Sequence, residues 1–220
     1  MTRTLSVPLL CLGVVLGLSA SSQAQIVTNG SFELPVVNGP FQRLSGAALT
    51  GWTITTGNVD LATSSLFQPL PGNGNQSLDL DGDVRGAIAQ VLSTVAGVTY
   101  DFSFVFSDNF QMAGVKTATV SLVDVVSSGS LLNANISHGT AVSTTNMNWT
   151  SFAGQFTATG ATTRLTFTST TTNALQGFGV VIDGVSVVNA AIPEPSPALL
   201  GGLMASVAGV VGLVRRRRSA

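Results

Sequence analysis

Apolar and polar residues alternate along several stretches of the chain. In VTYDFSFVFS, residues 98–107, every second residue from position 100 is aromatic, while Asp101 and Ser103 lie between them. The stretches 117–124 and 162–170 alternate in the same way, with Val120 and Phe167 on their apolar sides. Successive side chains of a β-strand point to opposite faces, so a period of two predicts half-buried strands.

Further strands are predicted at 51–56, 58–62, 76–81, 86–94, 149–158 and 178–188. Turn-forming clusters separate many of them, including PLPGNGN at 69–75 and SSGS at 127–130. About nine or ten antiparallel strands in one domain predict an all-β fold, a single β-sandwich of the jelly-roll type. Residues 125–147 are weakly patterned and fit either a long loop or two poorly patterned strands.

The N-terminal segment is predicted to be a signal peptide covering residues 1–24. It has a basic start at Arg3, an apolar core of about 14 residues that is too short to span a membrane comfortably, and small residues at Ser22 and Ala24. Cleavage is expected after Ala24. Cys11, the only cysteine, lies in this segment, so the mature chain is expected to be free of disulfides.

The C-terminal segment combines an apolar run with a basic end. Residues 198–214 carry no charge, and as a helix they cover roughly 26 Å, slightly less than a hydrocarbon core of about 30 Å. The four arginines that follow stop translocation and are retained in the cytoplasm. The segment predicts a short transmembrane anchor with the body of the protein outside.

The motif before that run makes the prediction more specific. Residues 193–220, which begin PEPSPALLGGL and close with the arginine cluster, resemble the PEP-CTERM sorting signal. The resemblance implies a Gram-negative bacterium that makes exopolysaccharide, and an exosortase, a membrane protease that removes the tail. The anchor is then transient, and the product is extracellular or on the cell surface. The motif residues are Pro193, Glu194, Pro195, Arg215, Arg216, Arg217 and Arg218.

The body between these segments, residues 25–192, is acidic. It contains nine acidic residues and four basic ones, which gives a net charge of −5. Lys116 is its single lysine, and the basic residues form no cluster along the sequence. This composition argues against nucleic acid as a partner, because nucleic-acid binding requires a basic surface.

Four short motifs in order carry a second resemblance. These are NGSFE at 29–33, GW at 51–52, SLDLDG at 77–82 and GVVIDGVSV at 179–187. They resemble the choice-of-anchor C family and plant cell-wall proteins that open with the same Asn-Gly-x-Phe-Glu motif. Those families are similar to galactose-binding-like carbohydrate-binding modules. The resemblance implies a jelly roll that binds extracellular polysaccharide.

Glu33 and Asp183 are the candidate metal ligands. The resemblance places them where many carbohydrate modules hold a structural calcium between the first and last strands. Asp183 also interrupts an apolar run, and a buried carboxylate needs a partner or a metal. The alternative is that Asp183 caps a turn before Gly184 and that Glu33 is exposed.

The segment LDLDGDVRG supplies the candidate ligand-binding residues Asp79, Asp81, Asp83 and Arg85. In an extended strand the three aspartates would share one face and would need a cation or hydroxyl donors between them. The spacing does not fit an EF-hand, because Val84 replaces the glycine at its sixth position. The alternative is a solvated strand end that runs into a turn at Gly82.

Trp52 and Trp149 could stack on sugar rings, but a tryptophan in a small β domain is more often part of the core. Tyr100 lies among core aromatics. His138, the sole histidine, is predicted to lie in a loop, without local support for a catalytic triad. The sequence therefore favours a non-catalytic module that binds exopolysaccharide. The alternatives are a structural matrix protein without specific sugar binding and, with less support, a glycoside hydrolase.

Overall fold

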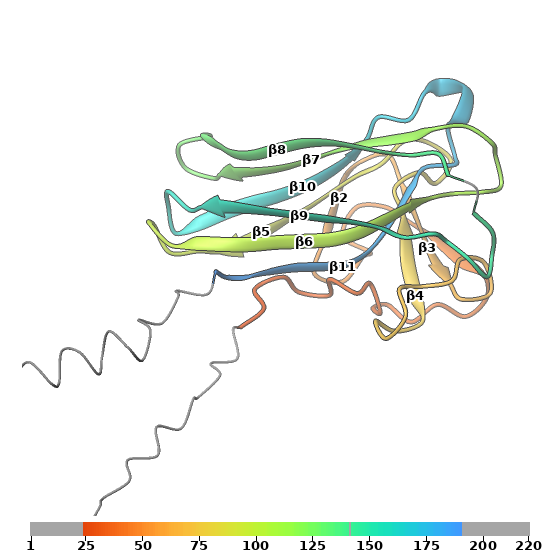
Figure 1. The fold of residues 1–220 in the computed structure, drawn as a ribbon, viewed down its shortest axis with the longest axis horizontal. Coiled ribbons are helices and arrows are strands. Elements are labelled where there is room, and N and C mark those ends of the chain that lie inside the picture. The colour runs from red at the N-terminus through yellow and green to blue at the C-terminus, as the bar shows by residue number, and fades with distance from the viewer. Residues whose placement is uncertain (1–23, 141, 191–220) are drawn as a thin grey trace, which may run out of the picture.

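The computed structural model describes residues 24–140 and 142–190, and within them the chain is almost entirely β-structure (Figure 1). The predicted signal peptide and sorting segment lie outside the described residues. The only helix among the described residues is a single 3-10 turn, η1, at Asn173–Leu175. No helix of this part of the chain is long and apolar enough to cross a membrane.

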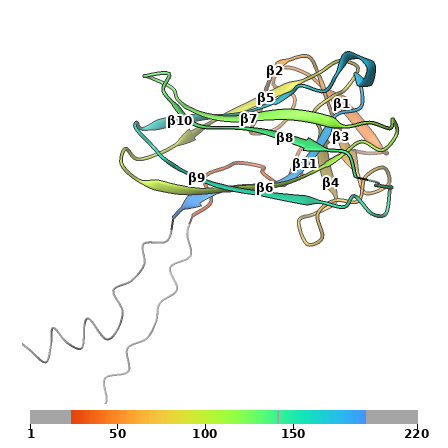
Figure 2. The same ribbon diagram turned by 45° about the horizontal axis from the view of Figure 1, so that its top comes forward.

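Eleven strands build two antiparallel sheets, which face each other as the two layers of a sandwich (Figure 2). The six-stranded sheet has the order β1-β3-β4-β11-β6-β9. The five-stranded sheet has the order β2-β5-β10-β7-β8. The strands are β1 (Phe41–Leu44), β2 (Thr53–Thr56), β3 (Val59–Thr63), β4 (Gln76–Asp79), β5 (Ala87–Ser93), β6 (Thr99–Asp108), β7 (Lys116–Asp124), β8 (Ser130–His138), β9 (Thr150–Thr157), β10 (Thr162–Ser169) and β11 (Val180–Asn189).

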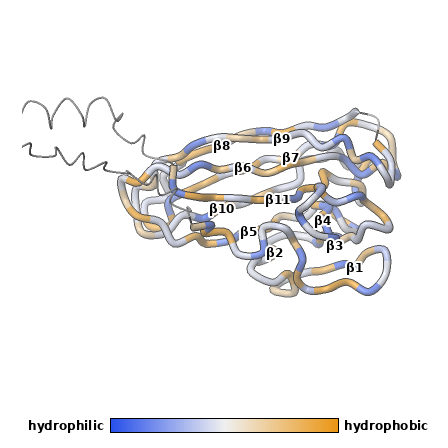
Figure 3. The backbone as a smooth tube through the Cα atoms, turned by 60° about the horizontal axis from the view of Figure 1, so that its bottom comes forward, coloured by the Kyte–Doolittle hydropathy of each residue, from blue (hydrophilic) through white to orange (hydrophobic). Residues whose placement is uncertain are grey.

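The alternating stretches form the centre of the sandwich, as predicted. Hydrophobic and hydrophilic residues largely alternate along β6, β7 and β10 (Figure 3), and the side chains on the inward face of each strand are buried. The Phe104 ring stacks on Phe152 at 4.9 Å and meets Phe167 from the other sheet edge-on at 5.0 Å. Aromatic rings thus join the two layers across the core.

A second, smaller core lies outside the sandwich. Phe67, Met147 and Val181 are buried together, with Phe110 and Trp149 packed against them. Val181 lies in β11 between Val180 and Ile182, which face the main core, so this cluster covers the outer face of the six-stranded sheet. It fixes the loops after β3 and β6 against the sheet, and those loops form one wall of the candidate site.

The chain ends and these loops lie at opposite ends of the sandwich. Ala190 donates a backbone hydrogen bond to Thr99 at the start of β6, and Val180 is paired with Asp108 at its end. The first and last described residues therefore lie beside the start of β6 (Figure 1), whereas the loops around Asn109 and η1 lie beyond its end.

Candidate functional site

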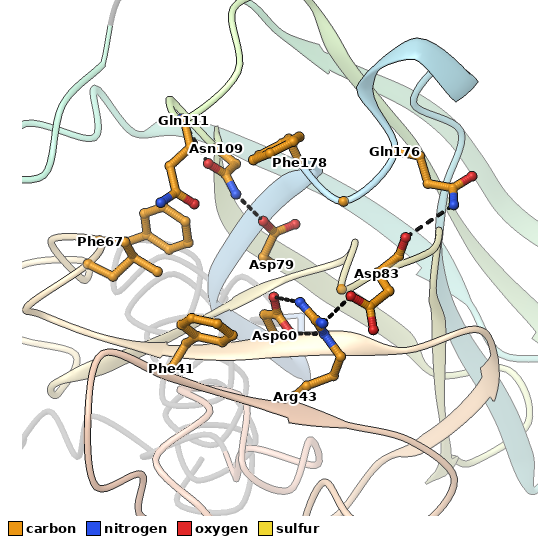
Figure 4. Close-up of a pocket in the computed structure, with 13 residues that line it drawn as sticks. Phe41, Arg43, Asp60, Phe67, Asp79, Asp83, Asn109, Gln111, Gln176 and Phe178 are labelled. Atoms are coloured by element: carbon orange, nitrogen blue, oxygen red, sulfur yellow. Dashed lines mark hydrogen bonds and ion pairs between the residues drawn. The ribbon is translucent and has the colours of Figure 1, made fainter.

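A pocket of about 390 Å³, whose lining side chains Figure 4 shows, opens beyond the end of β6, remote from the first and last described residues. Its walls come from β1, β3, the end of β4, the turn after β4, the loop after β6 and the segment before β11. Five separate segments of the chain, including the loop after β3, thus meet around one cavity. The lining side chains are aromatic or polar: Phe41, Arg43, Asp60, Phe67, Asp79, Asp83, Asn109, Gln111, Gln176 and Phe178, with Leu66 and two glycines.

Three phenylalanines provide the apolar part of the pocket. Phe67 is buried and is held edge-on by Phe110 at 5.8 Å, so its position is fixed. Phe41, the first residue of the edge strand β1, is 43% exposed, and Phe178 is partly buried. An exposed ring that borders a fixed one offers a flat apolar surface to a ligand.

Among the residues that the structure describes, Arg43 is the only cation that lines the pocket, and two carboxylates hold it. Arg43 and Asp60 are opposite each other in the β1–β3 register. The guanidinium donates to both oxygens of Asp60, at 2.8 and 2.9 Å, and also to Asp83. The hydrogen bond to Asp60 raises the pKa of Arg43 despite partial burial. This bidentate geometry fixes the guanidinium against the floor of the pocket.

Asp79 is the buried acid of the pocket. It is opposite Asp60 in the β3–β4 register, and its oxygens accept hydrogen bonds from the backbone of Asp81 (2.9 Å) and Gly179 (3.1 Å) and from the amide of Asn109 (2.8 Å). Burial raises the pKa of Asp79 well above its usual range, because desolvation outweighs these donors.

Asp79, Asp81 and Asp83 do not share one face, because the segment is not an extended strand but a strand end that runs into a turn, as the alternative interpretation had it. Strand β4 ends at Asp79, and the chain then turns, with Gly86 donating to the Leu80 carbonyl at 2.8 Å. Asp79 and Asp83 line the pocket, whereas Asp81 is buried behind it and does not. The side chain of Asp83 is 68% exposed.

Asp81 is a buried carboxylate without a hydrogen-bond partner for either oxygen. Ser169 and the amide of Gly86 approach it without reaching hydrogen-bond geometry, and burial raises its pKa while the charges of Arg85 and Lys116 oppose the rise. Arg85 is exposed and donates to the Thr171 carbonyl at 3.3 Å, outside the pocket. The predicted ligand set is therefore only half brought together.

The predicted metal ligands Glu33 and Asp183 meet at a different loop, residues 70–76. Glu33 Oε1 accepts the backbone N–H groups of Asn75 (2.9 Å) and Gln76 (2.8 Å). Asp183 accepts from Leu70 N at 2.9 Å and Asn73 Nδ2 at 2.5 Å. The two acids, from the two ends of the domain, therefore hold one loop in place.

Local geometry places Asp183 at that position. A β-bulge follows it in β11, where Gly184 has a φ of 61° and donates its N–H to Asp183 at 2.6 Å. Burial raises the pKa of Asp183 to about 7, and the charge of Glu33 adds to the rise. No group of three or more His, Cys, Asp or Glu residues with metal-binding geometry occurs in the part of the chain that the structure describes. The pair supplies hard oxygens that suit calcium, but Glu33 Oε1 and both oxygens of Asp183 already accept hydrogen bonds.

Both tryptophans have structural roles. Trp52 lies in the main core between Phe32 and Phe167, and its indole N–H donates to the Asn29 carbonyl at 3.2 Å. It is 3% exposed, so it does not offer a face to a sugar, and its place among the predicted ligand-binding residues is corrected. Trp149 packs against the smaller core and donates to the Gln68 carbonyl at 3.2 Å. Tyr100 lies in the core, as predicted.

His138 is not in a loop, as the sequence predicted, but at the end of β8, buried. Its Nδ1 contacts Asp108, and its Nε2 lies 3.1 Å from the Asn148 carbonyl. Both ring nitrogens thus face acceptors, which ties β6 and β8 to the segment before β9. With both nitrogens engaged, the residue holds three segments together beside the pocket.

Sequence reasoning missed most of the pocket, including Phe41, Arg43, Asp60, Asn109, Gln111, Gln176 and Phe178. One signal was available at Asp60, an acid inside the apolar stretch VDLAT, the same pattern that singled out Asp183. The others lie in an edge strand and in loops, and their meeting depends on the strand order.

The fold is that of a jelly-roll β-sandwich. An arabinose-bound α-L-arabinofuranosidase (MgGH51) has a similar arrangement, with a TM-score of 0.51 and 16% identity over 79% of this chain. This chain spans 27% of that enzyme's length. Also similar are a xylan-binding CBM22-1 domain from Paenibacillus barcinonensis Xyn10C (TM-score 0.49, 14% identity, 79% of this chain and 99% of that one) and TmCBM61 in complex with β-1,4-galactotriose (0.48, 13%, 76% and 99%).

Comparison of the sequence with protein-family models shows the family. A family model described as a protein of unknown function (DUF642) matches residues 25–188, and the chain belongs to that family. No curated protein is significantly similar to the chain.

Proposed function

We propose that this protein is a secreted, non-catalytic matrix protein that binds carbohydrate of an exopolysaccharide through the pocket at the end of its sandwich. The observation that carries the proposal is the pocket's lining, in which aromatic rings alternate with carboxylates and amides. The C–H face of a sugar ring is apolar, while its hydroxyl groups need hydrogen-bond partners on the ring edge. A cavity with ring faces and fixed polar groups meets both needs.

The acids of the pocket are engaged in ways that suit binding better than catalysis. Glycoside hydrolysis needs one carboxyl group that gives a proton to the leaving group and a second that acts as nucleophile or base. Both oxygens of Asp60 accept from Arg43, and both oxygens of Asp79 accept from backbone or amide donors. Both oxygens of Asp60 and both oxygens of Asp79 are therefore already used as hydrogen-bond acceptors. A reducing-sugar assay that detects turnover of the bound polysaccharide would instead support the hydrolase alternative.

The proposal includes export and processing. Signal peptidase is expected to act after Ala24, and exosortase to remove the segment that begins near Pro193, which releases the protein from transient anchoring in the inner membrane. Replacing Pro193, Glu194 and Pro195 with alanine should leave the protein bound to the membrane. Intact-mass analysis checks this, because a secreted product that still ends at Ala220 contradicts processing.

Calcium bound between Glu33 and Asp183 also remains a proposal. It is supported by the meeting of the two acids at one loop and by the effect of Glu33 on the pKa of Asp183. A divalent cation there would relieve the repulsion between the carboxylates. Its role would be structural, because the loop lies outside the lining of the pocket.

The direct test is retention of the purified protein on the host's own exopolysaccharide, with calcium and with EDTA. We expect retention by the unmodified protein and loss of it in Phe41→Ala, which removes the exposed ring of the pocket. Val126→Ala is the matched control, because Val126 is 87% exposed in the turn after β7, at the other end of the sandwich. Equal retention of all three proteins contradicts the pocket. No retention of any protein favours the alternative of a structural matrix protein without specific sugar binding.

A further inference from the structure

The charges that line the pocket restrict which sugars it accepts. Three acids, Asp60, Asp79 and Asp83, face one base, Arg43. Three of the five guanidinium N–H groups of Arg43 are engaged by Asp60 and Asp83. An acidic sugar is usually recognised by a free arginine or lysine. Because Arg43 is already neutralised, a uronate or a sulfate finds no free positive charge among the described residues that line the pocket.

The acids at the back of the pocket add less than their formal charge, because burial raises the pKa of both Asp79 and Asp81. Asp81 lies behind Asp79, is buried, and has no hydrogen-bond partner. Its charge is among the causes that raise the pKa of Asp79. Lys116 does not line the pocket and directs its ammonium group to the Met112 carbonyl at 2.5 Å, but its charge acts on Asp79 and Asp81. A positive charge entering the cavity would therefore meet the two carboxylates Asp60 and Asp83 against the single charge of Arg43, and it would favour the ionised form of Asp79.

Two of the three amides that line the pocket are also committed as donors. Asn109 donates its side-chain N–H to Asp79, and Gln176 donates to the Asp83 carbonyl at 3.1 Å (Figure 4). The carboxylate oxygens retain further lone pairs, so the surface presented to a ligand is rich in acceptors. A ligand that complements it must bring donors and, given the charge, a cationic group.

From this arrangement we propose that the pocket binds a protonated amino sugar, a hexosamine unit with a free amine, within the polysaccharide. This deepens the proposed function and rests on it. The ammonium group lies among Asp60, Asp79 and Asp83, and the sugar ring lies against Phe41 or Phe178. An N-acetylated unit lacks the charge, and a uronic acid carries the wrong one.

The test compares three hexasaccharides by calorimetry on the full-length protein at low salt: oligoglucosamine, its fully N-acetylated form and oligogalacturonate. We expect oligoglucosamine to bind at least about tenfold more tightly than the N-acetylated form, a difference of about 1.4 kcal/mol. We expect no measurable binding of oligogalacturonate. Equal affinity for the first two, or tightest binding of the third, overturns the inference while leaving carbohydrate binding intact. No binding of any oligosaccharide counts against the proposed function itself.

Variants separate charge from shape. Asp83→Asn removes an exposed carboxylate without emptying the core and should reduce the preference for the free amine several-fold. Asp60→Asn combined with Asp83→Asn releases Arg43 and should shift the preference toward oligogalacturonate. Asp101→Asn is the matched control, because Asp101 is near the start of β6, at the other end of the sandwich, and should leave the preference unchanged. A preference that survives the double substitution overturns the role of these charges.

A lysine hexapeptide serves as a second probe, because it presents ammonium groups without sugar rings. It should bind more weakly than oligoglucosamine, since it offers no ring face to Phe41 or Phe178. Binding as tight as that of the oligosaccharide would show that the pocket takes ammonium groups from any polymer and would overturn the assignment to sugars.

Discussion

Two groups of carboxylates lie on the outer face of the six-stranded sheet, and their surroundings differ. Asp183 and Glu33 accept hydrogen bonds from loop 70–76 and hold that loop closed. Asp60 and Asp83 hold an arginine beside an open cavity. In both groups an acid interrupts an apolar strand. An acid that interrupts an apolar strand is therefore buried or partly buried. Whether this acid fixes a loop or faces a ligand depends on which groups donate hydrogen bonds to it.

The largest expected effect is on the loop side of this comparison. Asp183→Ala leaves the N–H groups of Leu70 and Gly184 and the amide of Asn73 without their acceptor. Unsatisfied buried donors cost about 1–3 kcal/mol each, so a loss of about 3 kcal/mol in the free energy of unfolding is expected. Denaturant unfolding measures it. Asp101→Ala, which loses one exposed hydrogen bond to Gln155, should cost less than about 1 kcal/mol.

Calcium tests whether the loop acids also hold a metal. A ligand that binds only the folded state stabilises it by about 2.7 kcal/mol at a hundredfold excess over Kd, which for this size of domain raises Tm by roughly 5–10 °C. Millimolar calcium should raise Tm relative to EDTA, and Glu33→Gln or Asp183→Asn should abolish the difference. Superimposed melting curves for the unmodified protein would mean that the N–H donors alone satisfy these acids.

The pH dependence of stability follows from the same acids. The folded-state pKa of Asp183 is about 7, above its unfolded value, so the folded state binds more protons between the two values. Stability should therefore fall as pH rises from about 5 to 8, by on the order of 2 kcal/mol for this group. Asp79 and Asp81 have raised pKa values and add in the same direction. Melting curves over this range check the sign, and Asp183→Asn should flatten the dependence.

The smallest expected effect on stability is that of a substitution in the pocket. Phe41→Ala removes a half-exposed ring from an edge strand and should change the free energy of unfolding by less than about 1 kcal/mol. Its effect on affinity should be larger, about tenfold in Kd, because a ring that contacts a ligand contributes beyond its buried area. Calorimetry with the bound oligosaccharide, beside a melting curve, shows whether the two effects separate. A large loss of stability with unchanged affinity would exclude Phe41 from the site.

The strands that the sequence predicts are those that carry a face of the core. The alternation in β6, β7 and β10 places one whole side of each strand between the sheets, so the pattern survives in the sequence. The sequence pattern did not predict strand β1, and within the stretch 125–147 it did not distinguish strand β8 from a loop. Both are edge strands, in which few residues are buried, and this weakens the period-two signal.

The candidate site was less predictable than the fold for a similar reason. Asp79 and Asp83 were predicted as ligand-binding residues because they lie close together in one short motif, LDLDGDVRG. Asp60 and Arg43 meet them only because β3 lies between β1 and β4, and this strand order is not written in any local pattern. The position of Asp81 depends on the turn that follows β4. If β4 were two residues longer, the side chain of Asp81 would lie on the same face as that of Asp79.

The antiparallel pairing of β6 with β11 also determines how far the pocket lies from the proposed C-terminal anchor. Ten strand residues at about 3.3 Å each separate the chain ends from the pocket by roughly 30 Å. Under the proposed anchoring, many copies of the protein on one membrane would form a two-dimensional array of pockets that meets the same polymer. Such an array binds with avidity, because each further contact along one chain is intramolecular. Removal of the segment would leave the affinity of each pocket unchanged and convert a multivalent surface into a monovalent, diffusible ligand of the matrix.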